Sequence, residues 1–209
     1  RYNADGLSYQ RYERKSQAGA GDDILAGNCM TIVGLYRALS GLPPPPPRLY
    51  LEPHLTSELN GTKLCYQLRG REYLIDLNTD SYGVTAEGCT LRDTAPFGVN
   101  ATDSGLEYFP GRSAEWALSV ASPKGRPITV QIASWPNNPN APRRWSESMP
   151  LGAGKTPHVM AQLRPTALYK LTINGRTTAL LRADKSGRIR FASKRRDAAP
   201  QQFELRLAT

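Results

Sequence analysis

Five consecutive prolines at positions 43–47 divide this 209-residue chain into two parts that must fold differently. A proline run cannot continue a helix or occupy the middle of a sheet, because each ring fixes φ and removes a backbone N–H donor. We therefore expect these residues to form an extended, semi-rigid spacer. The residues before the run have a helical pattern, whereas those after it alternate like short β-strands.

The segment before the prolines is predicted to contain an irregular loop over residues 1–21 and one amphipathic helix over residues 22–40. Asp22 or Asp23 would cap the helix start, and Gly41 would end the helix. A single helix cannot bury its apolar stripe alone, so we expect helical neighbours that precede Arg1 in a longer polypeptide. The abrupt start without a signal peptide fits that expectation.

After the spacer, residues 48–95 are predicted to form a small antiparallel β unit. Its clearest signal is a hairpin, because residues 64–68 and 73–77 alternate between apolar and polar on either side of a tight turn at residues 69–71. Residues 96–114 lack a clear period and are predicted to be a linker.

Residues 115–209 are predicted to form an antiparallel β-sandwich. Short alternating runs recur, and the turns between them include Asn174–Gly175, which is the preferred type I′ hairpin pair, and Asp184–Gly187. Several short strands with a turn roughly every ten residues are typical of such sandwiches. The predicted fold class is therefore mainly β, with one N-terminal helix followed by a small β cap and an antiparallel sandwich.

The formal net charge of +9 raises the question of an anionic partner. The basic residues are dispersed, and their densest groups are Arg143–Arg144 and 194–196. Dispersed charge favours a solvated surface and leaves a polyanion-binding protein, above all a binder of acidic polysaccharide, as an alternative. No nucleic-acid motif and no apolar run of about 20 residues is present, so neither nucleic acid nor a membrane is an expected partner.

Metal and cofactor signatures are absent from the sequence. The three cysteines and two histidines have no metal-ligand spacing, and no glycine-rich phosphate loop is found, so no cofactor or metal is expected. Cys65 and Cys89 both fall in the small β unit and could form a disulfide across it if their backbones approach closely enough.

Three segments carry a resemblance to a known group of enzymes: GN-x-x-x-x-VGLYRALSGL at 27–42, RLYLEPHLTSELNGT at 48–62 and RGREYLIDL at 69–77. In this order they resemble the C-terminal end of glycoside hydrolases built on an (α/α)6 toroid, where the last toroid helix leads into a short β segment. The resemblance implies that the chain is the non-catalytic C-terminal portion of a secreted or periplasmic hydrolase. Its partners would be an upstream (α/α)6 catalytic domain and a poly- or oligosaccharide.

The last part of the chain carries a second resemblance. Residues 159–207, which include LRPTALYKLTINGRTTALLRADKSGRIRF, resemble immunoglobulin-like or fibronectin-type modules appended to secreted bacterial carbohydrate enzymes. That resemblance implies a β-sandwich and leaves the function open, because many unrelated proteins share such folds.

The toroid resemblance also implies where catalysis would occur. In such enzymes the loop before the last helix reaches the active site, and Tyr2–Asn3 is similar to a Tyr-Asn segment that closely follows a catalytic glutamate. That glutamate would precede Arg1, and the chain alone would be inactive. Glu13 is the only glutamate of the loop and the remaining catalytic candidate, although a solvated loop residue is the alternative.

Sugar binding has further candidates in Trp135, Arg143 and Trp145, which surround a loop rich in Asn, Pro and Arg. Aromatic faces stack on the apolar faces of sugar rings, while guanidinium and amide groups bind hydroxyls. If the chain is a stand-alone carbohydrate-binding module, the two rings should be coplanar and exposed on one surface. The alternative is that both rings cover the edge of the sandwich.

Overall fold

The computed structural model describes residues 11–12, 19–20, 48–52, 55–121, 126–150, 154–195 and 197–208. Within these ranges the chain forms β-strands and one short 3₁₀ turn, Ser57–Leu59, which confirms a mainly β fold. The N-terminal helix predicted over 22–40 and the proline spacer lie outside the described residues, and no α-helix occurs within them.

One large sheet has six strands in the order β16-β13-β10-β9-β8-β3. These are β3 (Leu49–Leu51), β8 (Phe97–Ala101), β9 (Gly105–Pro110), β10 (Leu118–Ala121), β13 (Gly154–Met160) and β16 (Ile189–Arg195). All neighbouring strands in this sheet are antiparallel.

The other large sheet has nine strands in the order β15-β14-β17-β12-β11-β7-β6-β5-β4. These are β4 (Thr62–Leu68), β5 (Arg71–Leu77), β6 (Tyr82–Ala86), β7 (Cys89–Asp93), β11 (Ile128–Ser134), β12 (Arg143–Ser148), β14 (Leu168–Ile173), β15 (Arg176–Arg182) and β17 (Gln201–Leu207). The pairing of β7 with β11 is parallel and the other pairings are antiparallel. Two short strands, β1 (Arg11–Tyr12) and β2 (Gly19–Ala20), pair separately.

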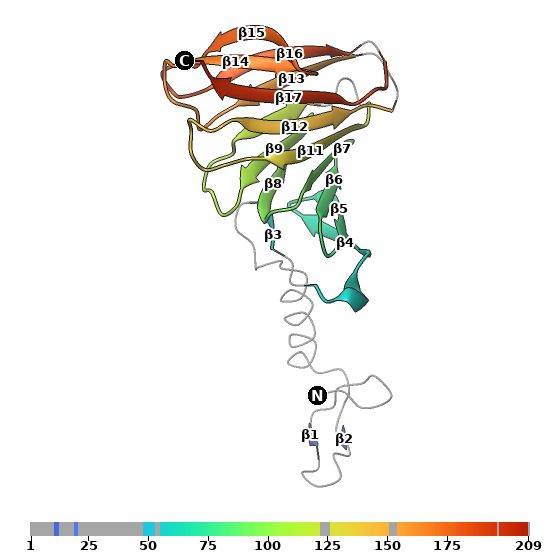
Figure 1. Cartoon of the computed structure of the whole chain (residues 1–209). Helices are drawn as coiled ribbons and strands as arrows, with labels where there is room; N and C mark the ends of the chain where they lie inside the picture. The colour runs from blue at the N-terminus through green and yellow to red at the C-terminus, as the bar shows by residue number, and fades with distance from the viewer. Residues whose placement is uncertain are drawn as a thin grey trace.

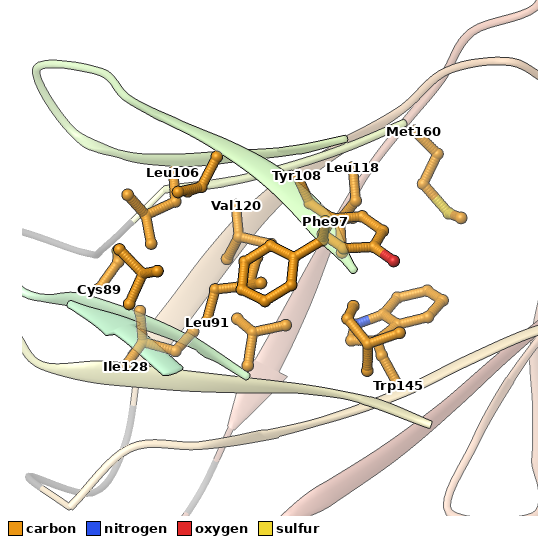
Figure 2. Packing of buried hydrophobic residues seen from close by; sticks show 14 of the residues in the cluster. Cys89, Leu91, Phe97, Leu106, Tyr108, Leu118, Val120, Ile128, Trp145 and Met160 are labelled. Atoms are coloured by element: carbon orange, nitrogen blue, oxygen red, sulfur yellow. The ribbon is translucent and has the colours of Figure 1, made fainter. Parts of the chain in front are cut away.

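The hydrophobic core lies between the two large sheets (Figure 1). Figure 2 shows Leu91 and Ile128 of the nine-stranded sheet facing Phe97, Leu106 and Val120 of the six-stranded sheet. Each of these side chains is almost completely buried, and burying one of them contributes about 1.5–3 kcal/mol to folding. The structure therefore confirms the predicted packing of two β-sheets.

Both predicted hairpins are present in the structure, and their turns contain the residues that the sequence indicated. Arg69 and Gly70 both have positive φ between β4 and β5, and Asn174 and Gly175 both have positive φ between β14 and β15. Two consecutive positive φ angles are the signature of a type I′ turn, whose twist matches that of the flanking strands.

The prediction of a linker over residues 96–114 is wrong, because this segment forms β8 and β9 in the interior of the six-stranded sheet. Most residues of these two strands are buried, and the buried ones lie on both faces, so the strands lack the alternation that reveals a strand covered on one side. The segments expected as a separate β unit and a separate sandwich supply strands to the same two sheets, since β7 pairs with β11 and β3 belongs to the same sheet as β10, β13 and β16.

Cys65 and Cys89 do not form a disulfide. Cys65 is exposed on β4 and Cys89 is buried on β7, with β5 and β6 between the two strands. Three strand spacings separate their backbones by about 14 Å, whereas a disulfide requires Cα atoms within about 7 Å.

Candidate functional site

The sequence-predicted site residues fall into two groups. Tyr2, Asn3 and Glu13 lie outside the described residues. Trp135, Arg143 and Trp145 are described, and they lie on or directly after β11 and on β12.

Trp145 and Arg143 belong to the interior of the sandwich. Alternation along β12 points Arg143, Trp145 and Glu147 toward the core and Arg144 toward solvent. Trp145 has no exposed surface, and its ring stacks on Phe203 with a centroid distance of 5.0 Å. The prediction of two coplanar, exposed tryptophans is therefore wrong, since the rings of Trp135 and Trp145 are tilted by 51° and one of them is covered.

Trp135 is half-buried and lines a surface hollow of about 560 Å³. The hollow, here called the Trp135 hollow, is built by chain segments that are distant in sequence: the end of β3, the turn after β7, the end of β9 with the residues that follow it, and the end of β11. Its polar and aromatic lining residues are Tyr50, Glu52, Asp93, Thr94, Tyr108, Arg112, Ser134, Trp135 and Asn137.

Aromatic rings form a continuous row behind this hollow. Trp135 meets Tyr108 edge-on at a centroid distance of 5.3 Å, and Tyr108 in turn lies 6.0 Å from Phe97. On another side, the guanidinium carbon of Arg143 lies 5.8 Å from the Trp135 ring centroid, at the outer limit of a cation–π contact. These contacts hold the indole in one orientation, which is what a stacking surface requires.

Asp93 lies in the wall of the hollow and is almost completely buried. One carboxylate oxygen accepts the backbone N–H groups of Thr94 at 2.7 Å and Ala95 at 3.0 Å, and the other accepts the hydroxyl of Tyr108 at 2.7 Å. Burial raises the pKa of Asp93, and the three hydrogen bonds oppose that effect. Burial beside the carboxylate also raises the pKa of Tyr108 far above its ordinary value.

Glu52, Tyr50 and Arg112 form a polar group at the rim. Arg112 donates to Glu52 in an ion pair, and the Tyr50 hydroxyl lies 3.4 Å from the same carboxylate oxygen. The Arg112 guanidinium carbon lies 5.6 Å from the Tyr50 ring centroid. Burial raises the pKa of Tyr50, so this phenol is a neutral hydrogen-bonding group at physiological pH.

These groups suit binding better than hydrolysis. A catalytic carboxyl pair needs one group free to protonate the leaving oxygen and another free to attack or to activate water. Both oxygens of Asp93 are engaged by protein donors, and Glu52 is paired with Arg112. What remains is a concave surface with an aromatic wall and convergent donors and acceptors, as in small-ligand sites.

The sequence alone did not reveal Tyr50, Glu52, Asp93 or Arg112 as members of this site. These residues lie in segments that are far apart in the sequence, and the arrangement of strands in the two sheets brings the segments together. Asp93 had one usable signal, because an aspartate that ends a strand commonly turns the chain by accepting the next backbone N–H groups.

A second polar cluster is enclosed in the core. Glu147 accepts the indole N–H of Trp145 at 2.8 Å and lies 2.5 Å from Nε2 of His158, while Arg195 donates to the Glu147 backbone carbonyl at 3.0 Å. All of these side chains are buried, and burial lowers the pKa of Arg195. His158 also stacks on Phe191 with a centroid distance of 4.5 Å. The cluster is therefore enclosed in the core and has no access to solvent.

No group of three or more His, Cys, Asp or Glu side chains within the described ranges is arranged to hold a metal ion. In the part of the chain that the structure describes, no helix has the length and apolar character needed to span a bilayer.

Comparison of the chain with models of known protein families, with curated proteins and with solved structures gave no match.

Proposed function

We propose that this chain is the C-terminal, non-catalytic portion of a secreted glycoside hydrolase, and that its sandwich binds a poly- or oligosaccharide in the Trp135 hollow. The observation that carries the proposal is the hollow itself, in which a half-buried indole stands beside charged and neutral hydrogen-bonding groups. Sugars require this combination, because their ring faces are apolar and their edges carry hydroxyls.

The sequence resemblance supports the same proposal at one point. Tyr50 and Glu52 belong to the LYLEPHL segment, which is part of the resemblance to toroid glycosidases, and both line the hollow. The upstream (α/α)6 catalytic domain, its hydrolase activity and its export from the cytoplasm form the wider part of the proposal and rest on that resemblance.

Saccharide binding is tested with two exposed residues of the hollow, Arg112 and Asn137. Affinity electrophoresis through gels that contain soluble polysaccharides identifies a ligand, and titration calorimetry then measures the affinity. Arg112→Ala is expected to weaken binding about tenfold, because a charge-assisted hydrogen bond contributes about 1.5–3 kcal/mol. Asn137→Ala should weaken it to a smaller extent.

The matched control is Arg176→Ala, which removes an exposed arginine from β15 outside the hollow. This variant should bind the saccharide as the unmodified protein does. Equal affinity of the Arg112 and Arg176 variants, or no retention by any neutral or acidic polysaccharide, would rule out the Trp135 hollow as a sugar site.

The hydrolase parentage needs a separate experiment. Intact-mass measurement and N-terminal sequencing of the natural protein would establish whether helical repeats precede Arg1. With such repeats present, glycosidase activity is expected from the longer polypeptide and not from the 209-residue chain alone. Hydrolysis by the short chain would contradict the non-catalytic role.

A further inference from the structure

A second hollow, of about 410 Å³, lies on the solvent-facing side of the nine-stranded sheet. It extends over five neighbouring strands, β15, β14, β17, β12 and β11. Along these strands the alternate residues Tyr169, Leu171 and Phe203 point into the core, so their neighbours line the outer face. We call this surface the basic hollow, after Arg144, Lys170 and Arg206.

The charges in the basic hollow are unbalanced. Glu204 is the one carboxylate among the residues that line it. Glu204 accepts a hydrogen bond from Nε of Arg144 at 2.7 Å, and it lies 4.0 Å from Nε of Arg206. The Lys170 side chain makes no hydrogen bond or ion pair with any residue that the structure describes. Three cations therefore share one anion on a half-exposed surface.

The strand register places two of these cations next to each other, which destabilises the sheet. Lys170 on β14 is directly opposite Arg206 on β17, and both point to the same side of the sheet. Like charges at directly opposed positions destabilise a sheet, whereas opposite charges stabilise it. An anionic ligand in the hollow would remove this repulsion and pair with the ammonium group.

Neutral hydrogen-bonding groups accompany the cations. Thr172, Thr177 and Gln202 line the same hollow. The aromatic residue among the lining is Phe203, which is 2% exposed and offers no ring face for stacking. Single-stranded nucleic acids are bound largely by stacking of bases on aromatic rings, so the lining favours a ligand rich in hydroxyls.

We propose that the basic hollow binds an acidic saccharide, an oligosaccharide whose carboxylate or sulfate groups pair with Lys170 and Arg206. The overall net charge of +9 favours the approach of such a polymer. The inference goes beyond the proposed function and does not depend on it, because the charged residues involved are absent from the Trp135 hollow. The exposed residue Ala133 lines both hollows, so one sugar chain could extend from one to the other.

The test compares two double variants of the whole chain with equal changes in charge. Lys170→Gln with Arg206→Gln neutralises the hollow, and Arg190→Gln with Lys194→Gln neutralises two exposed residues of β16 outside both hollows. Calorimetry would use oligogalacturonate as the carboxylate probe and sulfated dextran as the sulfate probe. Neutral dextran and single-stranded DNA serve as comparison ligands.

The hollow variant is expected to lose about tenfold or more in affinity for the better acidic probe, since it lacks both charge-assisted contacts. The β16 variant should change affinity by less than about threefold, and binding should weaken steeply with salt. Whichever acidic probe binds more tightly identifies carboxylate or sulfate as the recognised group.

Three results would overturn the proposal: no binding of either acidic probe, equal losses in the two double variants, or tighter binding of DNA with the same sensitivity to Lys170 and Arg206. A thermal melt confirms that the hollow variant is folded. Removal of the opposed cations should leave it as stable as the unmodified protein or more so. Loss of neutral-sugar binding in Arg112→Ala alone would concern the Trp135 hollow and leave this result unaffected.

Discussion

At the scale of single residues, Glu147 is the position on which the buried polar contacts converge. It accepts from Trp145, lies against His158 and is 3.8 Å from a guanidinium nitrogen of Arg195. Removal of one member of a buried, hydrogen-bonded charge group leaves its partners unpaired in a medium of low dielectric.

Glu147→Ala is therefore expected to lower the free energy of unfolding by about 3–5 kcal/mol, measured by urea denaturation. Glu72→Ala is the control, since this exposed residue of β5 accepts a surface hydrogen bond from the Gln67 side chain. A loss of less than about 1 kcal/mol in Glu147→Ala would show that the cluster does not hold the sheets together.

Asp93 gives the stability of the protein a defined pH dependence. Its folded-state pKa is raised above the unfolded value of about 3.9, so the folded state binds more protons than the unfolded state between those two values. The free energy of unfolding therefore decreases as pH rises through the folded pKa, and this contribution is fully present below the unfolded pKa.

Asp93→Asn should remove that dependence, because the amide keeps an acceptor for the two backbone N–H groups and does not ionise. We expect the unmodified protein to gain stability relative to this variant as pH falls from about 7 to about 4. Denaturation curves at several pH values measure the difference, and a difference that is constant with pH would contradict a raised pKa.

At the scale of strands, two glycines near the ends of β9 should respond differently to a methyl group. A Cβ on Gly105 would lie 2.0 Å from the carbonyl oxygen of Val120 on the neighbouring strand, whereas a Cβ on Gly111 would meet no atom within 4 Å. Gly111 has a φ of 52°, so alanine there bears only the cost of a left-handed backbone.

Gly105→Ala is expected to destabilise the protein by about 3 kcal/mol, and Gly111→Ala by about 1–2 kcal/mol. Thermal unfolding of the two variants provides the comparison. Equal melting temperatures would show that β9 and β10 can separate at this end without loss of packing.

Strand prediction succeeded where one face of a strand is covered and the turn has a strict chemical requirement. Alternation over Tyr73, Ile75 and Leu77 and the Asn174–Gly175 pair both gave the correct hairpins. It failed for β9, where Phe109 is buried under the Arg48 guanidinium on the outer face, so that buried apolar residues occur on both sides of the strand. Local sequence does not reveal such cover when it comes from a residue 61 positions away.

The two tryptophans predicted as sugar-binding residues lie in different surroundings. Trp135 lines a hollow, whereas Trp145, ten positions later, is in the core. The difference depends on which way each residue points from its strand, and a one-residue irregularity between Ile132 and Ser134 shifts the register in β11 just before Trp135. Such an irregularity has no signature in the composition of the loop.

At the scale of the whole molecule, the segments that the sequence divided into a β unit, a linker and a sandwich depend on one another. A chain limited to residues 115–209 would lack β7, β8 and β9, and with them the core side chains Leu91, Phe97, Leu106 and Tyr108. Strands β10 and β11 would each lose a neighbour and expose a backbone edge.

We therefore expect the 115–209 fragment to show no cooperative unfolding transition in calorimetry and to bind a hydrophobic dye, as loosely packed states do. A chain of residues 48–208 is the control and should unfold in one transition, because it retains all strands of both large sheets. A cooperative transition of the shorter fragment would contradict this prediction and show that residues 115–209 form an independent domain.

The parallel pairing of β7 with β11 also has a consequence for the time that the chain needs to fold. β7 ends at Asp93 and β11 begins at Ile128, and the intervening chain builds β8, β9 and β10 in the opposite sheet. The chain loses conformational entropy when this long segment closes, before the contacts between β7 and β11 can stabilise it. We therefore expect this pairing to form late and slowly. In newly synthesised chains the edges of β7 and β11 would stay unpaired after the hairpins before and after them in the sequence have formed. During this interval aggregation through the unpaired edges competes with folding.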